Sequence, residues 1–398
     1  MSKVAMSALG NLVDSVETWS PERDAPDDSF VYIDLSAVDQ DAKAITAARE
    51  MPCAEAPSRA RQLVRAGDVL VSTVRPNLNA VAQVPSEFDG ATASTGFCVL
   101  RPRPETLDGA YLLHWVRSSR FVSEMVRRAT GASYPAVSDR IILESSLPLP
   151  PLHEQRRIAE LLDRADALRA KRRAALAQLY HLTQSIFLDM FGNHTTILKR
   201  WPTKKLGELL DFLTSGSRGW AEHYAESGDL FLRIQNVRRD ELLLDDIAYV
   251  NTPDTVEAKR TRVEPGDVLL SITADLGRTA AVPEGLGPAF INQHLSILRT
   301  KALAPQFLSA YLTSPVGQCQ VSGRNRHAVK AGLNFDDIRS FIVPVPPTGL
   351  QQDFVRRVTS VEKLKVTYRA ALTEMDALFA TLQHRAFRGE LSLSIPNI

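Results

Sequence analysis

The stretch LHEQRRIAELLDRADALRAKRRAALAQLYHLTQSIFLDMF, residues 152–191, decides the fold, because it has no glycine or proline and repeats apolar side chains at helical spacing. Gly192 ends the run, and Arg172 interrupts the apolar stripe. At about 1.5 Å per residue, such a helix is about 60 Å long. A stripe this narrow needs a partner helix. The stripe consists of Ile158, Leu161, Ala165, Leu168, Ala175, Leu179, Leu182 and Ile186.

The same pattern returns near the C-terminus, and it is part of a repeat that covers the whole chain. LGNLVDSV and LGELLDFL, AGDVLVS and PGDVLLS, CVLRP and SILRT, and two RAAL segments recur at offsets of 196 to 199 residues. The second helical stripe ends at Gly389. We therefore expect two copies of one unit whose long helices form an antiparallel coiled-coil pair. The second stripe consists of Phe354, Val358, Val361, Leu364, Tyr368, Ala371, Met375, Leu378 and Leu382.

In each copy the sequence pattern changes at a pair of prolines, from short apolar runs to a long helical pattern. Before the prolines, short apolar runs such as DVLVSTV, GFCVLRP and DVLLSIT lie between Gly, Pro, Asn and Asp, which predicts strands and turns. A shorter helical stretch follows in each copy, in YLLHWVRSSRFVSEMV and in QFLSAYLTSPVGQCQV. The fold class is α/β in the α+β sense, with a mixed domain at 1–150, a helix at 151–192, a second domain at 193–347 and a helix with its tail at 348–398. Pro150, Pro151, Pro346 and Pro347 are expected to start the two helices.

Composition is that of an ordinary globular protein. The 398 residues are 44% hydrophobic and 23% charged, and 47 Lys and Arg stand against 46 Asp and Glu. The near-neutral charge means that any nucleic-acid binding must come from local patches or from a partner. No apolar run has the length of a signal peptide or of a spanning helix, so we expect a cytoplasmic protein without a membrane partner. Cys53, Cys98 and Cys319 show no metal or disulfide spacing.

The motifs of several enzyme classes are missing from the sequence. There is no G-x-x-x-x-G-K-[ST] loop and no G-x-G-x-x-G, and HEQRR at His153 lacks the second histidine of a zinc helix. PDTVEAK, residues 253–259, spaces its acids too tightly for a nuclease metal site on adjacent strands. No Asn-Pro-Pro-Tyr loop for a flipped adenine is present. We expect a chain without catalytic residues, a metal or a bound cofactor.

The segment LPLPPLHEQRRIAELLDRADALRAKRRAALAQLYHLTQSIFLDMFG resembles the central helical region of specificity (S) subunits of Type I restriction-modification systems. PVPPTGLQQDF through AFRGEL resembles their second helical region, and the paired LGNL, LGEL and GDVL segments resemble their two target-recognition domains. The resemblance implies a non-catalytic DNA-specificity subunit. In this family each recognition domain reads half of a bipartite DNA site, while the helices set the spacer and dock two methyltransferase (M) subunits.

The resemblance also assigns chemistry to partner subunits. S-adenosylmethionine would be bound by the M subunits, which methylate adenine, and ATP and Mg by restriction (R) subunits where these are present. Two domains related by a pseudo-twofold can address two half-sites on one double-stranded DNA, with a spacer set by their separation. Because the copies share only scattered residues, we expect the half-sites to be unlike.

The candidate DNA contacts lie in three kinds of segment. Loops after the GDVL strands carry side chains that can pair with base edges, and so does the predicted strand LFLRIQNVRR. Loops that precede the last short strand of each domain carry further basic or hydroxyl groups. The candidates are Arg75, Asn77, Asn79, Ser133, Tyr134, Arg233, Gln235, Asn236, Thr273, Asp275, Arg278, Arg324, Arg326 and Lys330.

Alternative interpretations remain for these residues and for the chain. Asn, Asp and Gly-rich loops are often plain turns, and strand alternation places some polar side chains on a solvated sheet face. Arg127 and Arg128 stand where cations favour a helix end. The chain as a whole could serve as the specificity module of another DNA-modifying enzyme, or as a coiled-coil scaffold whose domains bind protein only.

Overall fold

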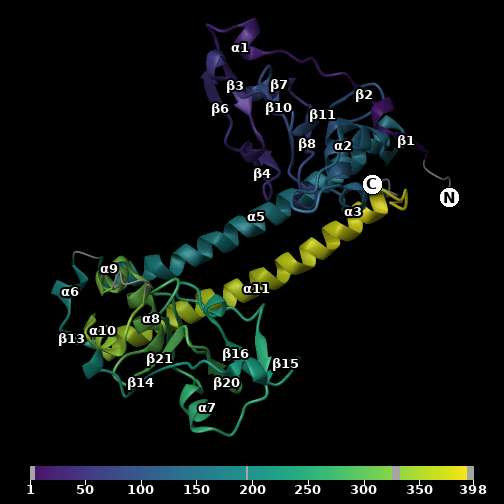
Figure 1. The fold of residues 1–398 in the computed structure, drawn as a ribbon. Coiled ribbons are helices and arrows are strands. Elements are labelled where there is room, and N and C mark those ends of the chain that lie inside the picture. Colours follow the sequence, from purple (N-terminus) through teal and green to yellow (C-terminus); the bar gives the residue numbers. More distant parts are fainter. Residues whose placement is uncertain (1–4, 194–195, 325–331, 392–398) are drawn as a thin grey trace, which may run out of the picture. The chain divides into compact units, whose positions relative to one another are not determined.

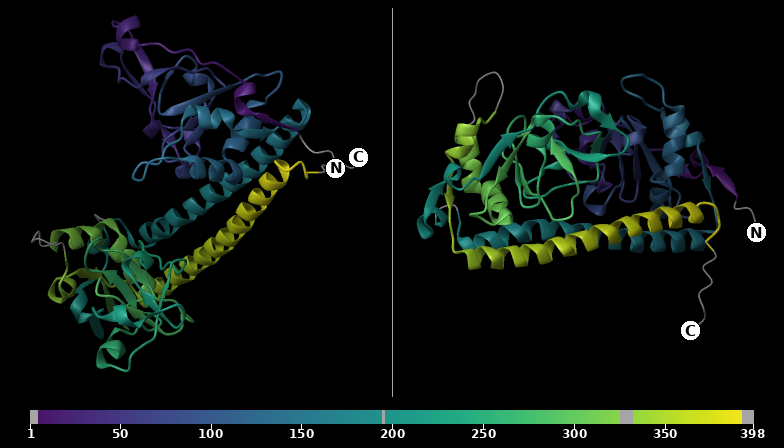
Figure 2. Two further views of the ribbon diagram at one scale, coloured as in Figure 1. Left: turned by 45° about the vertical axis from the view of Figure 1, so that its right-hand side comes forward. Right: turned by 90° about the horizontal axis from the view of Figure 1, so that it is seen from below.

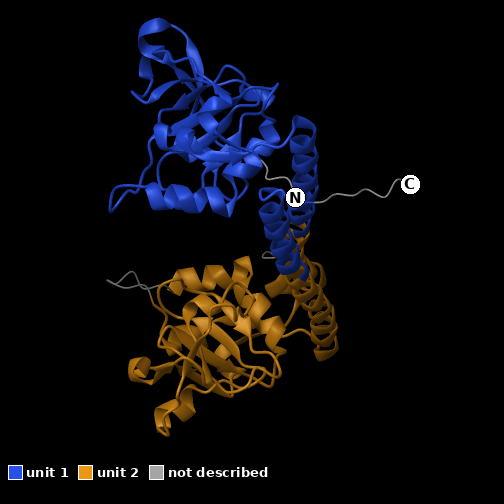
Figure 3. Ribbon diagram, turned by 90° about the vertical axis from the view of Figure 1, so that its right-hand side faces the viewer, with its two compact units in different colours: residues 1–172, 371–398 blue, residues 173–370 orange. Residues whose placement is uncertain are grey.

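A computed structural model describes residues 5–193, 196–324 and 332–391. The chain divides into two compact units, shown in separate colours in Figure 3. Unit 1 comprises Met1–Arg172 and Ala371–Ile398, and unit 2 comprises Arg173–Ala370. Each unit contains one mixed α/β domain and parts of both long helices, as the sequence repeat predicts.

Unit 1 contains the first domain (Figure 1). Its strands are β1 (Met6–Ala8), β2 (Val13–Asp14), β3 (Ser29–Ile33), β4 (Val38–Asp39), β5 (Ala44–Ile45), β6 (Arg49–Pro52), β7 (Ala60–Leu63), β8 (Val69–Ser72), β9 (Val81–Gln83), β10 (Thr92–Ser94), β11 (Phe97–Pro102) and β12 (Ser146–Pro148). Its helices are α1 (Pro21–Asp24), α2 (Gly109–Val116), α3 (Ser119–Arg128) and α4 (Asp139–Glu144), and α5 (Leu152–Phe191) begins here.

Unit 2 contains the second domain. Its strands are β13 (Thr203–Lys205), β14 (Phe212–Ser215), β15 (Tyr224–Ala225), β16 (Asp229–Leu232), β17 (Ala248–Val250), β18 (Val268–Ser271), β19 (Thr279–Ala281), β20 (Ala289–Ile291), β21 (Leu295–Arg299) and β22 (Ile342–Pro344). Its helices are α6 (Ile197–Arg200), α7 (Val256–Thr261), α8 (Pro305–Thr313), α9 (Pro315–Arg324) and α10 (Phe335–Arg339), and α11 (Thr348–Ala386) begins here.

The two domains share their sheet topology. In unit 1 one sheet has the order β2-β11-β8-β9, and unit 2 matches it with β14-β21-β18-β19. The second sheets also correspond, because β3 pairs parallel to β10 and β16 pairs parallel to β20. The edges differ: β7 extends the sheet beside β10, whereas in unit 2 that edge has a single bridge, Arg262 to Phe290, and β15 extends the opposite edge. The repeat in the sequence is therefore a repeat of topology.

The GDVL segments begin the central strands β8 and β18. Gly67 and Gly266 have φ of +92° and +86°, a backbone conformation that favours glycine. The next residues, Asp68 and Asp267, are 2% and 0% exposed and accept two hydrogen bonds each from a neighbouring guanidinium. Parallel bidentate pairs of this kind are strong and geometrically specific. The partners are Arg101 in unit 1 (3.0 and 2.8 Å) and Arg299 in unit 2 (2.7 and 2.9 Å), the two arginines that align in the sequence repeat.

The expected long helices are present with the predicted start and stop of α5. In both views of Figure 2, the parts of α5 and α11 that belong to the same unit lie side by side. In unit 1 the Arg169 Nε donates to Asp376 Oδ1 at 2.6 Å. In unit 2 Phe187 and Phe191 pack on Phe354 with ring centroids 5.7 and 5.4 Å apart. Within each unit the N-terminal part of one helix meets the C-terminal part of the other, which makes the pair antiparallel.

A glutamine fastens each domain to the start of its helix. Gln155 accepts from the Asp108 amide at 2.9 Å and donates to the carbonyl oxygens of Thr106 and Pro150. Gln351 repeats the arrangement with the Ala304 amide at 2.8 Å and the Pro346 oxygen. Both side chains are almost fully buried. These bonds explain why HEQRR and LQQDF carry a glutamine at the same offset.

The predicted apolar stripe of the two long helices is buried only in part. Ile158 packs into the core of the first domain together with Leu162, which is buried in place of the predicted Leu161, and Phe354 and Val358 pack into the core of the second. Four stripe residues are instead exposed. They are Leu168 and Leu378 in unit 1 and Leu182 and Leu364 in unit 2. The ends of the helices bury apolar residues because the domains supply partners there.

Candidate nucleic-acid interface

The loop after β8 in unit 1 has a fixed backbone. Arg75 adopts φ +49°, in the left-handed region that non-glycine residues seldom occupy. The Ser72 hydroxyl donates to the Val74 oxygen at 2.9 Å, and the Arg75 amide donates to the Pro135 oxygen at 2.7 Å. A second loop, residues 130–137, is thereby held against the first, although the two are far apart in the sequence.

The exposed side chains of these two loops come together. The Arg75 guanidinium lies 4.9 Å from the centroid of the Tyr134 ring, which is 67% exposed. Asn77 and Ser133 are also exposed on the loop pair. Gly131 makes the turn possible, because a Cβ there would lie 2.8 Å from the Tyr134 oxygen and its φ is +99°. The result is a cation stacked on an aromatic ring at the surface.

Asn79 has a different place from its neighbours. It adopts φ +47°, and its carbonyl oxygen accepts from the Lys43 Nζ at 2.6 Å. Burial of Lys43, with the nearby Arg117 charge, lowers the pKa of its ammonium group. Asn79 Nδ2 donates to the Arg117 oxygen at 3.5 Å. Asn79 therefore anchors the loop end to α2.

Unit 2 builds the same loop pair with other side chains. Ala274 has φ +62° at the position equivalent to Arg75, the Ser271 hydroxyl donates to the Asp275 oxygen, and Thr273 bridges to Gly332. Thr273 is hydrogen-bonded to His294 Nδ1. Arg278 donates through Nε to Asp275 Oδ2 at 2.7 Å and through Nη2 to the same oxygen. Asp275 and Arg278 thus form an ion pair and are not two independent readers.

The segment LFLRIQNVRR is a strand only as far as Leu232, which corrects the predicted longer strand. Ile234–Asn236 is a turn of 3-10 helix. Asn236 is 1% exposed, its Oδ1 accepts from the Arg233 amide at 2.9 Å, and its Nδ2 donates to two carbonyl oxygens. This places Asn236 inside the fold, where it cannot reach a base. Arg233 and Gln235 both donate to Asp246, and only Gln235 of the two is exposed.

Arg324 makes hydrogen bonds within its own domain, and its expected phosphate contact stays a prediction. Its Nε donates to the Ser340 hydroxyl at 2.6 Å, its Nη2 to the Ser340 oxygen, and its guanidinium lies 5.2 Å from the Phe341 ring centroid. Arg128 is its counterpart in unit 1 and donates to the Ile141 oxygen. Both arginines tie a helix end to the following segment. Arg326 and Lys330 lie outside the described residues.

The sequence indicated the loops but not the contacts that their residues make with other segments. The stacking of Arg75 on Tyr134 and the contact of Lys43 with Asn79 join residues from separate segments, so no spacing rule reveals them. In the part of the chain that the structure describes, no cluster of three His, Cys, Asp or Glu residues could hold a metal ion. No helix among these described residues has the length and apolarity to cross a membrane.

Comparisons with known proteins identify the family to which this chain belongs. The family model described as "Type I restriction modification DNA specificity domain" matches residues 64–178 and 199–374, which is more than half of the chain. The chain belongs to this family. The two matches fall on the two copies of the repeat.

Curated relatives agree with the family assignment. The Type I restriction enzyme EcoBI specificity subunit of Escherichia coli is 24% identical over 306 residues, which are 68% of this chain and 64% of that protein. The EcoKI specificity subunit of Escherichia coli strain K12 is 26% identical over 326 residues, 74% of this chain and 68% of that protein. The chain thus matches about two thirds of the length of these relatives.

A solved structure matches almost the full length. It comes from work on complex assembly and conformational transition of the type I R-M system, has 27% sequence identity and a TM-score of 0.64, and covers 98% of this chain and 99% of that chain. The Type I specificity fold therefore extends over both domains and both long helices.

Proposed function

We propose that the chain is the DNA sequence-specificity subunit of a Type I restriction-modification complex and has no catalytic role of its own. One observation carries the proposal. Each domain presents a loop pair with the same left-handed turn, at Arg75 and at Ala274, but with different exposed side chains. A common frame with unlike side chains suits a protein that reads two different half-sites of double-stranded DNA.

In unit 1 the reading group would be Arg75. Its guanidinium is exposed and held over the Tyr134 ring, so its plane is restricted before DNA arrives. A guanidinium with this preorganisation can donate two hydrogen bonds to guanine O6 and N7, or contact a phosphate. Asn77 and Ser133 would add contacts from the same surface. We expect Arg75 to contribute about 1–3 kcal/mol of discrimination.

In unit 2 the reading group would be the pair of Asp275 and Arg278. The carboxylate, which is the more exposed of the two, can accept a hydrogen bond from the cytosine amino group. The guanidinium would then stay in place as its counter-ion, because its charge is already compensated. Thr273 and Gln235 would supply further polar contacts at this surface.

The long helices would dock two M subunits and set the spacer between half-sites. Leu168, Leu182, Leu364 and Leu378 support this role, since these four leucines of the predicted stripe are exposed on the described helices. In such a complex the M subunits would bind S-adenosylmethionine and methylate adenine. R subunits, where present, would bind ATP and Mg.

The test is co-expression with the neighbouring M subunit in a methylation-free host, followed by mapping of modified adenines across the genome. A single bipartite motif with two unlike halves and a fixed spacer is the expected result. A stable complex that methylates no motif would mean that the domains do not direct a methyltransferase.

Two other functions give different outcomes in the same host. A specificity module of another DNA-modifying enzyme would bind DNA but leave adenine unmodified. A coiled-coil scaffold would assemble with protein partners and tolerate alanine at Arg75 and at Arg278 without any change in DNA binding. Turnover of DNA by the purified chain alone would contradict the non-catalytic role.

A further inference from the structure

The two copies differ sharply where each domain meets the long helices. In unit 1 an α2 side chain and the residue that follows α2 bind α5: His114 Nε2 lies 2.8 Å from Asp163 Oδ1, and Arg117 donates to Asp166 Oδ2 at 2.6 Å. The Phe379 ring of α11 packs 6.3 Å from the imidazole. The offset of 196 residues that aligns the prolines replaces all three large residues by small ones in unit 2, namely Ala310, Thr313 and Thr183.

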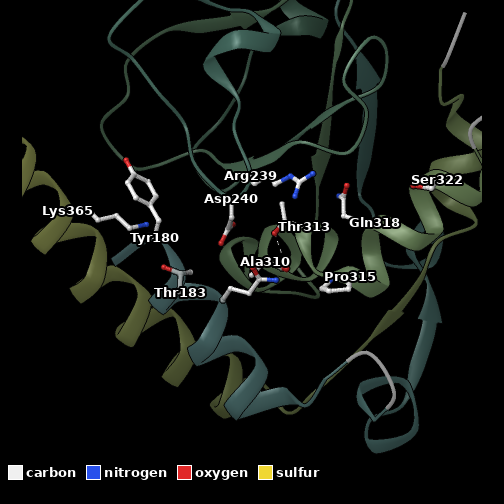
Figure 4. A pocket seen from close by; sticks show the side chains of 11 residues that line it. Tyr180, Thr183, Arg239, Asp240, Ala310, Thr313, Pro315, Gln318, Ser322 and Lys365 are labelled. Atoms are coloured by element: carbon white, nitrogen blue, oxygen red, sulfur yellow. Dashed lines mark hydrogen bonds between the residues drawn. The ribbon is translucent and has the colours of Figure 1, made fainter. Parts of the chain in front are cut away.

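A cavity of about 380 Å³ lies in unit 2 at this position, and Figure 4 shows the side chains around it. Its walls come from α5, α8, α9, α11 and the turn that contains Arg239 and Asp240. The residues that matter for its chemistry are Tyr180, Thr183, Asp240, Thr313, Gln318 and Lys365. The small residues thus leave room that their counterparts in unit 1 occupy.

Two neutral polar groups on the wall have spent their donors, and the Thr183 hydroxyl has not. Gln318 Nε2 donates to the Gly277 and Leu312 oxygens at 2.8 and 2.9 Å, so its Oε1 is the atom left for a ligand. The Thr313 hydroxyl donates to the carbonyl oxygens of its own helix. Thr183 is 6% exposed, and its Oγ1 has no hydrogen-bond partner among the residues that the structure describes. A buried hydroxyl in this state costs stability unless something else satisfies it.

Asp240 adds a carboxyl group to these acceptors. It lies in a turn with φ +62°, and its amide donates to the Thr279 oxygen. Burial raises the pKa of Asp240 to about 7, and the Ser309 hydroxyl and Lys365 oppose the rise. The other charged groups that face it are Glu362 on α11 and the neighbouring Glu241, which both raise its pKa.

The cations near the cavity are mostly compensated. Lys365 Nζ donates to Glu362 Oε1 at 2.6 Å and lies 4.7 Å from the Tyr180 ring centroid. Arg369 pairs with Glu241 and donates to the Tyr180 hydroxyl. Arg239 also lines the cavity, and its exposure to water weakens but does not remove its repulsion of a bound cation. Apart from the paired Lys365, the wall therefore carries the Asp240 carboxyl group, the Gln318 Oε1, the Thr183 hydroxyl and the exposed Arg239 guanidinium.

We propose that this cavity is a binding site for a small organic cation with a primary ammonium or guanidinium group. Several N–H donors on one cation would satisfy Asp240, the Gln318 Oε1 and the orphan Thr183 hydroxyl together. Mg²⁺ and Ca²⁺ are poor candidates, because they favour more than the single carboxylate that lines this wall. An anion would lie against Asp240, and of the two cations in the lining Lys365 already donates to Glu362.

The test is isothermal titration calorimetry of the full-length protein with putrescine at pH 7, in two buffers of different ionisation enthalpy. We expect saturable binding of one putrescine per chain. Binding should release about half a proton, because the cation favours the ionised form of a carboxyl group that is about half protonated at this pH. Asp240→Asn should weaken binding at least about tenfold, and Thr183→Phe should abolish it by filling the cavity as Phe379 does in unit 1. Glu226→Gln removes an exposed carboxylate away from the cavity and should change nothing.

The variant Arg239→Gln distinguishes a positively charged ligand from a negatively charged one. Loss of this cation should tighten putrescine binding, whereas an anion site would lose affinity. Titrations with inorganic phosphate and with Mg²⁺ complete the design. Absence of saturable putrescine binding to the wild type, unchanged binding in both Asp240→Asn and Thr183→Phe, or phosphate binding that depends on Arg239 would overturn the proposal. Thermal unfolding of each variant establishes that the fold is retained.

Discussion

The two copies of the repeat share their buried contacts but differ in the side chains that they expose. Asp68 with Arg101 and Asp267 with Arg299 form the same buried bidentate pair beside the same glycine turn. A few residues further on, the same backbone turn carries Arg75 in one copy and Ala274 in the other. Duplication preserved what holds the central strand and varied what the loop presents to a partner.

The largest effect is expected from the shared ion pair. Asp68→Ala leaves Arg101 without its carboxylate in the core, and removal of one partner from a buried pair costs about 3–5 kcal/mol of unfolding free energy. Hydrogen exchange followed by mass spectrometry should show lost amide protection in the first domain. Asp267→Ala should do the same in the second domain.

Glu17→Ala is the matched control for this experiment. It breaks the exposed ion pair with Arg65, which is worth less than about 1 kcal/mol. Equal losses of protection in Glu17→Ala and Asp68→Ala would show that the buried pair does not hold the domain.

A smaller effect is expected from the loops, and here the copies should differ. Arg75→Ala should weaken binding to the cognate DNA by about 1–3 kcal/mol, because it removes an uncompensated donor group. Arg278→Ala should cost less, since Asp275 already neutralises this cation. Fluorescence anisotropy of the S–M complex with cognate and half-site-substituted duplexes measures both. A greater loss for Arg278→Ala would reverse our assignment of the reading groups.

Asp275→Ala tests the same ion pair by removing its carboxylate. The substitution frees the Arg278 guanidinium, so non-specific DNA binding should rise and its salt dependence should steepen by about one phosphate contact. Discrimination at the second half-site should fall. Unchanged salt dependence would mean that Arg278 does not face the DNA.

The sequence predicted most of the fold because the repeat and the helical stripe are strong patterns. α5 begins and ends at the predicted residues, and the GDVL and CVLRP segments form strands β8 and β11. The strand through Arg233 to Asn236 was wrong, because the Asn236 side chain caps a turn instead. Local patterns do not reveal a side chain that substitutes for backbone hydrogen bonds.

The candidate site was predictable only as a set of loops. Arg75 and Tyr134 were both singled out, but their contact depends on how two segments fold together. The sequence did not reveal the internal bonds of Arg324, because a basic residue in a glycine-bounded segment looks the same whether it binds phosphate or, as here, the Ser340 carbonyl oxygen. The exposed leucines of the helix stripe were likewise indistinguishable from buried ones by periodicity alone.

The two copies should also differ in the pH dependence of their stability, with opposite signs. Burial lowers the pKa of His114 below its ordinary value near 6.5, so the unfolded chain binds a proton first and unit 1 loses stability as pH falls below about 6.5. Burial raises the pKa of Asp240 to about 7, so the native state keeps a proton that the unfolded chain releases near 3.8. Unit 2 therefore loses stability as pH rises from about 4 to 7. Calorimetric unfolding should be followed between about pH 4 and 7 for the wild type and two variants. His114→Gln should remove the pH dependence of unit 1 alone, and Asp240→Asn that of unit 2 alone. If both variants kept the wild-type profile, these two groups would not control it.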